Sequence, residues 1–277
     1  MTTATIRRGS GLGFAMPAML LLLAFFIIPV AGLLMRSVTE PEPGLQNYAA
    51  LLGSATYAKV FFNTFFVAGL VTIVTMLIAF PVSWALAIMP SRWAAILFAV
   101  ILLSMWTNLL ARTYAWMVLL QQTGLINRSL MALGLIDQPL QLTNNLVGVT
   151  IGMVYIMLPF MILPLYGVIK KIDPAILQAA ALCGATKAQA LRRVLLPLAA
   201  PGLASGGLMV FVMSLGYFVT PSLLGGTANM MLPELIVQQV QSLVNWGMGG
   251  AAAFILLVVT LGLYALQLRF FEPKEGR

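Results

Sequence analysis

The sequence has no histidine, a single cysteine (Cys183) and only 8% charged residues among its 277 positions. Without histidine, neither a Ser-His nor a Cys-His catalytic pair can be built, and one cysteine supports neither a disulfide framework nor a Cys/His metal cluster. Only seven carboxylates remain for acid–base chemistry. These absences exclude most classes of enzyme and argue against an integral membrane enzyme.

Hydrophobic residues, in contrast, make up 61% of the chain, and its mean hydropathy is +1.00. A soluble domain of this size would not tolerate that composition, so the sequence predicts an integral membrane protein. The net charge of +8 is typical of cytoplasmic loops that face anionic lipid. We therefore expect membrane lipid, and no nucleic acid, among the partners.

Six long runs without charge predict six membrane-spanning helices, since about 20 apolar residues cross a hydrocarbon core of about 30 Å. The expected fold is all-α, because the alternation of a spanning β-barrel is absent, and we expect a single transmembrane domain over residues 1–277. The first run is longer than a signal-peptide core and lacks a small-residue cleavage site after it, so we expect it to be retained. The predicted crossings are residues 14–35, 60–88, 94–110, 146–169, 202–224 and 247–268.

The distribution of basic residues predicts the orientation of these crossings. Eleven lysines and arginines fall on the side that holds both termini, and four fall on the other side. The positive-inside rule then places both termini in the cytoplasm. The eleven are Arg7, Arg8, Arg92, Lys170, Lys171, Lys187, Arg192, Arg193, Arg269, Lys274 and Arg277, and the four are Arg36, Lys59, Arg112 and Arg128.

The loop over residues 111–145, on the outer side, is too polar for a full crossing. Its apolar residues recur at helical spacing, which predicts an interfacial or re-entrant helix broken at Gly124. Proline residues inside the crossings predict kinks.

The most charged stretch follows the fourth crossing, at residues 170–201. Asp173 before Pro174 predicts the start of a short helix through Leu182. Gly184 permits a sharp turn, and Thr186 with Gln189 forms a capping box that predicts a second short helix, ending before Pro197. We call this helix-turn-helix segment, residues 170–201, the elbow.

Two roles for the elbow follow from its residues. Ala175, Ala179, Ala180 and Ala181 give the first short helix a small-residue surface that another protein could approach closely. The basic residues around it would equally favour an amphipathic helix lying on the inner leaflet. The residues alone leave both roles open.

The segment QAAALCGATKAQALRRVLLPLAAP, residues 178–201, resembles the EAA loop of binding-protein-dependent ABC importer permeases. That loop has Glu-Ala-Ala, a glycine after three further residues, and a later hydrophobic-x-Leu-Pro. The order of crossings fits as well, so the resemblance covers essentially the whole chain and implies the type I permease fold. Gln178 stands where the family usually has glutamate. The residues that the resemblance assigns to contact with an ATPase are Gln178, Ala179, Ala180, Gly184, Ala185, Lys187 and Pro197.

Three further segments resemble the first permease subunit of spermidine/putrescine-type importers. They are MWTNLLARTYAW (105–116), GMVYIMLPFMILPLY (152–166) and SLGYFVTPSLLGG (214–226). This resemblance implies half of a translocation pathway for polyamines. The same subfamily includes relatives for opines, aminophosphonates and other small amino compounds, which are the alternative substrates.

The resemblance also implies the partners: a second permease subunit, an ATPase dimer at the elbow and a periplasmic substrate-binding protein, at a bacterial inner membrane. No G-x-x-x-x-G-K-[ST] loop occurs in the chain, so it cannot cradle ATP phosphates itself. We therefore expect no cofactor in this chain, with ATP and Mg on the partner ATPase.

Polar and aromatic residues at the depth of the crossings are candidates for the substrate pathway, because lipid offers such groups no partners. Aromatic faces suit amines through cation–π contacts. The alternative for each is an interhelical hydrogen bond or an interfacial anchor, which we favour for Ser214. The candidates are Trp106, Asn108, Tyr155, Tyr217 and Thr220.

An ion-coupled secondary transporter is the competing hypothesis. Against it, no Asp, Glu, Lys or Arg lies within the six predicted crossings, which leaves few groups to relay protons.

Overall fold

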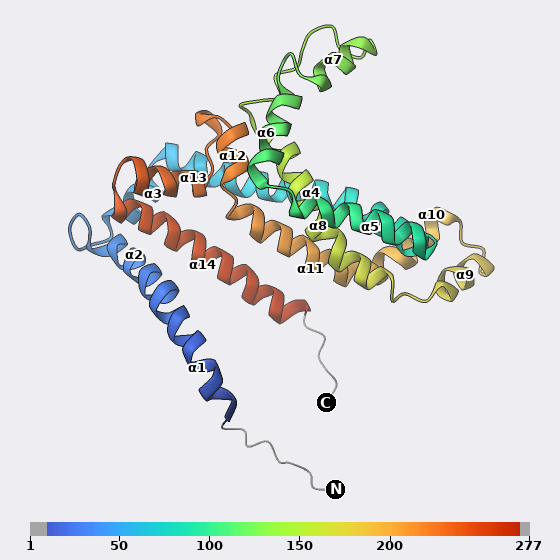
Figure 1. The fold of residues 1–277 in the computed structure, drawn as a ribbon, viewed down its shortest axis with the longest axis horizontal. Coiled ribbons are helices and arrows are strands. Elements are labelled where there is room, and N and C mark those ends of the chain that lie inside the picture. Colours follow the sequence, from blue (N-terminus) through green and yellow to red (C-terminus); the bar gives the residue numbers. More distant parts are fainter. Residues whose placement is uncertain (1–9, 272–277) are drawn as a thin grey trace. The chain divides into compact units, whose positions relative to one another are not determined.

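The computed structural model describes residues 10–271, and over that range the chain is helical (Figure 1). Five helices are long and apolar enough to cross a membrane, and a sixth span forms if one bent helix pair is counted. The all-α expectation is confirmed. Of the basic residues used for the orientation, Arg7, Arg8, Lys274 and Arg277 lie outside the described residues.

The chain divides into two compact units. One contains the described residues up to Ser54 together with Ile236–Ile255, and the other contains Ala55–Leu235 and the residues from Leu256. The candidate site residues named above all belong to the second unit, so the fold of that unit matters most for function.

The first unit is held together by polar contacts around the end of its long N-terminal helix. The Ser37 hydroxyl lies 2.7 Å from the Tyr48 hydroxyl, and the Asn47 amide donates to the carbonyls of Ser37 and Glu40 at 2.9 and 2.7 Å. The Arg36 guanidinium lies 5.1 Å from the ring of Trp246. The helical segments of this unit are α1 (Ser10–Leu22), the π turn η1 (Leu23–Ile27), α2 (Ile28–Thr39), α3 (Gln46–Gly53), the π turn η4 (Gln238–Ser242) and the first part of α14 (Trp246–Phe271).

The second unit contains the end of α14 and the remaining elements, except that the last two residues of α13 belong to the first unit. They are α4 (Ala55–Ile88), α5 (Ser91–Trp106), α6 (Leu109–Leu120), α7 (Leu125–Ala132), α8 (Leu146–Ile169), α9 (Pro174–Leu182), α10 (Lys187–Ala190), the π turn η2 (Leu191–Leu195), α11 (Leu196–Leu215), α12 (Val219–Leu224), the 3-10 turn η3 (Thr227–Asn229) and α13 (Leu232–Val237).

Helices α4, α8 and α11 pack against one another and form the core of the second unit. Met153, Met157 and Met161 of α8 are fully buried in it. A Cβ atom at Gly206 of α11 would lie 2.8 Å from the Met161 sulfur, so the glycine lets these two helices approach closely. In Figure 1, α9 and α10 lie at one end of this bundle, and α12 lies toward the other.

The predicted third crossing, 94–110, extends beyond the observed helix. Helix α5 ends at Trp106, and the chain then bends by 98° into the pair α6–α7. The cause is local: the Asn108 side chain accepts hydrogen bonds from the backbone N–H groups of Leu110 and Ala111 at 2.9 and 3.3 Å, and so begins a new helix. The hydropathy of residues 94–110 does not reveal such a cap.

The predicted fifth crossing, 202–224, is wrong at both ends, and so is the stop before Pro197. One continuous helical span runs from Lys187 to Leu215, and α12 is separate from it. The π turn η2, in which the Leu196 N–H donates to the Leu191 carbonyl, directly precedes Pro197. Its wider turn accommodates a proline that would otherwise break a helix.

The other predicted boundaries agree within a few residues, and 146–169 matches α8. The predicted break at Gly124 is also present, since this residue is the N-cap of α7. A Cβ atom there would lie 2.4 Å from the Leu119 carbonyl oxygen, so the turn between α6 and α7 requires glycine.

Candidate functional site

The elbow forms through the capping contacts that its sequence predicts. The Asp173 carboxylate accepts a hydrogen bond from the Ala175 N–H at 2.9 Å and begins α9. Gly184 has φ of +81°, a left-handed conformation that glycine adopts without steric cost. The Thr186 hydroxyl accepts from the Gln189 N–H at 3.3 Å while the Gln189 side chain accepts from the Thr186 N–H at 2.9 Å, which is a complete capping box.

Most of the elbow residues predicted to contact an ATPase are on the surface of this chain. Gln178, Ala179, Gly184, Lys187 and Pro197 are exposed, while Ala180 and Ala185 are half-buried. Leu182, at the end of α9, is 89% exposed. With Ile176, which is 42% exposed, it makes part of the exposed surface of α9 apolar.

The polar candidates of the pathway divide into two groups. Trp106 and Asn108 lie at the break between α5 and α6, where Trp106 is 88% exposed and the Asn108 oxygen is used as the cap of α6. Tyr155, Tyr217 and Thr220 lie on or beside the elements α8 and α12, which contact each other.

Two contacts join this second group to α6. The Trp116 and Tyr155 rings meet edge to face with centroids 5.5 Å apart. The hydroxyls of Thr113 and Thr220, both fully buried, lie 3.4 Å apart. Since Thr113 donates its only hydroxyl proton to the Leu109 carbonyl at 3.0 Å, Thr220 is the donor to Thr113.

Helix α12 approaches α8 closely enough to require a small residue there. A Cβ atom at Gly152 would lie 2.8 Å from the Thr220 methyl group. The polar residues described here come from α6, α8, α12 and the short segment before α12. We call them the polar cluster: Arg112, Thr113, Trp116, Tyr155, Tyr217 and Thr220.

Arg112 is the charged member of the polar cluster. Burial raises the pKa of Tyr217, which follows the end of α11, and the positive charge of Arg112 opposes that rise. Tyr217 is therefore a neutral phenol at physiological pH and can donate a hydrogen bond. The Arg112 Nε is buried and finds no hydrogen-bond partner among the described residues.

Sequence reasoning did not identify Thr113, Trp116 or Arg112 as pathway residues. All three fall in the polar segment assigned to the outer loop. Only the bend after α5 brings α6 into contact with α8 and α12. The preference for an interhelical hydrogen bond at Ser214 was wrong, because its buried hydroxyl has no partner among the described residues.

One carboxyl group is buried in the second unit. Glu234 of α13 is 9% exposed, and its Oε1 has no hydrogen-bond partner within the described part of the chain. Burial raises the pKa of Glu234 to about 7, partly offset by a hydrogen bond to the Met231 backbone. Over residues 10–271 no three His, Cys, Asp or Glu side chains lie close enough together to hold a metal ion.

Comparison with known proteins gives a family match over most of the chain. The model of the family described as "Binding-protein-dependent transport system inner membrane component" matches residues 49–274. The spermidine/putrescine transport system permease protein PotB of Salmonella typhimurium (strain SL1344) is 36% identical over 222 residues, which cover 80% of this chain and 77% of PotB. The inner membrane ABC transporter permease protein YdcU of Escherichia coli (strain K12) is 35% identical over 250 residues, covering 85% and 77% of the two chains.

Among solved structures, a chain of the bacterial alginate ABC transporter in complex with an alginate pentasaccharide-bound periplasmic protein shares the fold. The TM-score is 0.73 at 17% identity, with 94% of each chain covered. At that identity the likeness concerns the fold alone, and it agrees with the arrangement of helices described above.

Proposed function

The chain belongs to the family of binding-protein-dependent transport system inner membrane components, and from this premise we propose that it forms half of a translocation pathway for polyamines. As a permease subunit of an ABC importer it is a transport component of the inner membrane and not an enzyme. Family membership also removes the ion-coupled secondary transporter as an alternative.

The observation that carries the polyamine assignment is the 36% identity to a spermidine/putrescine permease over 80% of this chain. The polar cluster supports it chemically. Trp116 and Tyr155 form an aromatic pair, and Tyr155 is 38% exposed and so within reach of a ligand. Aromatic faces attract ammonium groups and hold them without a buried counter-charge. Weak holding of this kind suits a pathway that must release its substrate.

A small zwitterionic amino compound, such as an opine or an aminophosphonate, is the second candidate substrate. Arg112 favours it, because a guanidinium pairs with carboxylate or phosphonate oxygens and repels a polyamine. The two substrates therefore differ in which member of the cluster they need: the aromatic pair for a polyamine, and Arg112 for a zwitterion.

The partners that we propose are a second permease, an ATPase dimer and a periplasmic binding protein. The chain lacks a phosphate-binding loop, so ATP and Mg would be bound by the ATPase. The rigidly capped, exposed elbow is the surface that we assign to contact with that ATPase. Both termini and the elbow then lie in the cytoplasm, as the excess of lysine and arginine on that side favours.

The continuous helix from Lys187 to Leu215 suggests how the ATPase would act on the polar cluster. Its 29 residues span about 43 Å at 1.5 Å per residue. It begins in the elbow at Lys187, directly after Thr186 of the capping box, and ends at Leu215, two residues before Tyr217. A displacement of the elbow is therefore carried along one helix to the cluster, where it would open one side of the pathway and close the other.

The test is ATP-driven uptake of labelled putrescine and spermidine by the complete complex reconstituted with its binding protein, using the native chain and Tyr217→Ala. We expect saturable uptake that excess unlabelled polyamine abolishes and that Tyr217→Ala reduces. Competition by zwitterionic amino compounds but not by polyamines would overturn the polyamine assignment and favour the second candidate, while the assignment as an importer permease would stand.

A further inference from the structure

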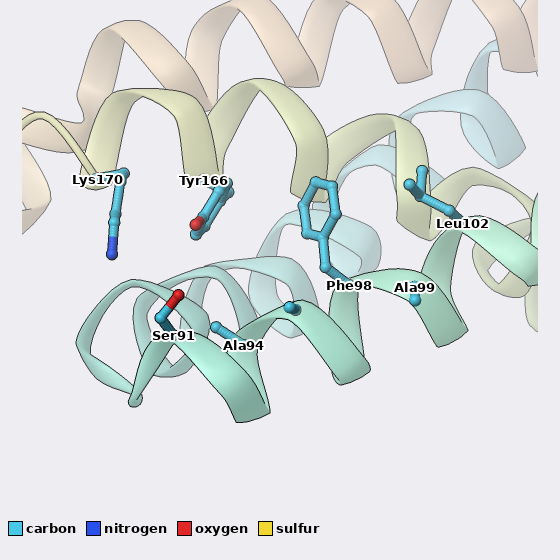
Figure 2. A pocket seen from close by; sticks show the side chains of 8 residues that line it. Ser91, Ala94, Phe98, Ala99, Leu102, Tyr166 and Lys170 are labelled. Atoms are coloured by element: carbon cyan, nitrogen blue, oxygen red, sulfur yellow. The ribbon is translucent and has the colours of Figure 1, made fainter.

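A groove of about 460 Å³ lies between α5 and the end of α8 (Figure 2). Helix α5 supplies one wall, and Tyr166 and Lys170 stand on the opposite one. The Phe98 and Tyr166 rings, whose centroids are 5.2 Å apart, meet across it. None of its lining residues belongs to the polar cluster, and only Lys170, the first residue of the elbow, is shared with the elbow. The lining residues are Ser91, Ala94, Ala95, Phe98, Ala99, Leu102, Tyr166 and Lys170.

The lining of α5 follows one face of the helix. The α5 residues that line the groove recur at spacings of three and four residues from Ser91 to Leu102. This spacing places them in line along the helix axis. Eleven residues at 1.5 Å each give a length of about 16 Å, which is close to half of a hydrocarbon core of about 30 Å. The groove is therefore as long as one leaflet of a bilayer is deep.

The shape of the groove suits an extended chain. Its volume of about 460 Å³ is spread along the face of α5 from Ser91 to Leu102. Small side chains at Ala94, Ala95 and Ala99 leave an elongated apolar space there, which a single extended hydrocarbon chain can follow.

One end of the groove is polar and positive. The Lys170 ammonium donates one hydrogen bond to the Ala87 carbonyl, at 3.3 Å, in the last turn of α4, where the helix dipole also favours a cation. An ammonium has three donors, so two remain. Among the described residues the one ion pair is Arg36–Glu40, so Lys170 has no carboxylate partner. Arg92 follows the lining residue Ser91 in sequence and adds positive charge.

We propose that this groove binds an anionic phospholipid of the inner leaflet. Its phosphate is held by Lys170 and by the Ser91 hydroxyl, and one acyl chain lies along the alanines toward Leu102. Basic residues at the cytoplasmic ends of spanning helices, next to an apolar surface, are the features by which anionic headgroups are recognised. This assignment goes beyond substrate transport and holds whichever substrate the importer carries.

Lipid retention by the purified complete complex tests the headgroup. The complex is equilibrated with phosphatidylglycerol or phosphatidylethanolamine, and bound lipid is counted by native mass spectrometry. We expect Lys170→Gln to lower phosphatidylglycerol retention about tenfold, as for the loss of one hydrogen bond to a charged group, while the exposed neighbour Lys171→Gln has little effect. Equal retention by the native chain and Lys170→Gln, or equal retention of the two lipids, would overturn the proposal.

The acyl-chain position is tested by filling the groove while Lys170 is kept. Ala99→Leu should lower retention of phosphatidylglycerol, whereas Val100→Leu, which enlarges a 57% exposed neighbour that does not line the groove, should not. A photoreactive phenylalanine analogue at position 99 should form adducts with lipid. Unchanged retention in Ala99→Leu, or adducts with the second permease in place of lipid, would contradict the assignment.

Discussion

The elbow and the polar cluster differ in how far along the chain their contacts reach. The hydrogen bonds that shape the elbow join residues two or three positions apart, Asp173 to Ala175 and Thr186 to Gln189. The Thr113–Thr220 contact of the polar cluster joins residues 107 positions apart. The elbow is therefore determined by local chemistry, whereas the cluster exists only once α6, α8 and α12 have packed together.

The two regions should also fail differently when they are mutated. A change in the elbow should leave the folded core of the second unit intact and disconnect it from the ATPase. A change in the polar cluster should alter the handling of substrate while the ATPase still drives the helices.

The largest effect is expected for Gly184→Trp in the elbow. No atom lies within 4 Å of a Cβ placed at Gly184, so a side chain can leave the backbone there, and a bulky indole would occupy the surface assigned to the ATPase. The left-handed backbone adds a cost of about 1–2 kcal/mol. We expect normal membrane insertion and loss of uptake, measured by transport assay and by surface expression.

Gly184→Asn is the matched control, since asparagine adopts the left-handed conformation with less strain and carries a much smaller side chain. It should retain most of the uptake. Normal transport by Gly184→Trp in an intact complex would show that the elbow does not transmit the movement.

The second effect is expected for Trp116→Ala in the polar cluster. Removing the ring takes away the partner of Tyr155 and one face for an ammonium group, which contributes up to about 2 kcal/mol when desolvated. We expect the KM for polyamine uptake by the reconstituted complex to rise about tenfold or more. Trp93→Ala, a 58% exposed tryptophan of α5 that lies outside the cluster, is the control. Equal effects of the two variants would remove Trp116 from the pathway.

A pH-dependent effect of intermediate size is expected at Glu234. The pKa of its carboxyl is about 7 in the folded protein against 4.5 for an unperturbed group, so the folded state binds a proton that the unfolded chain has released. The stability conferred by the protonated group is present at low pH and is lost as the pH rises from about 4.5 to about 7.

Melting of the native complex should therefore occur at a lower temperature at pH 8 than at pH 5, and Glu234→Gln should reduce that difference. Glutamine keeps the size of the side chain and cannot ionise. The same pH dependence in both proteins would show that Glu234 is ionised at neutral pH.

The smallest effect is expected for the buried threonine pair. Thr220→Val removes one hydrogen bond at nearly constant volume, which costs about 1 kcal/mol. Thr113→Val should cost more, because it also removes the hydrogen bond to the Leu109 carbonyl. The double variant should cost less than the sum, because each single change already breaks the shared contact. A double-mutant cycle on the thermal stability of the complex measures this coupling. Strictly additive effects would mean that the two hydroxyls do not interact.

The same contrast explains what the sequence could predict. Asp173, Gly184 and the Thr186–Gln189 pair each specify backbone geometry within one or two turns, so their structural roles followed from residue type and spacing. The buried α8 was predicted to the residue because its apolar run is bounded by Asn145 and Lys170. The break at Gly124 was also predicted, from a glycine within a helical pattern.

The remaining features depend on contacts that a linear pattern does not contain. The bend after Trp106 rests on one asparagine in an otherwise apolar run. The helix continues past Pro197 because a π turn precedes this proline, and the residues of that turn have the sequence pattern of an ordinary helix. Arg112, Thr113 and Trp116 were assigned to an outer loop because their segment is polar, yet packing against α8 and α12 makes them part of the polar cluster.

The central claim is that the elbow is the cytoplasmic surface through which an ATPase acts on the polar cluster. Labelling of Cys183 tests this claim most directly. This cysteine is the only one in the chain and is exposed in the elbow, so no engineering is needed. A membrane-impermeant maleimide is applied to oriented vesicles from either face, with and without the ATPase subunit. We predict labelling only from the cytoplasmic face, strong protection by the ATPase, and loss of uptake when labelling precedes assembly. Equal labelling with and without the ATPase in a complex that still transports, or labelling from the outer face, would contradict the account.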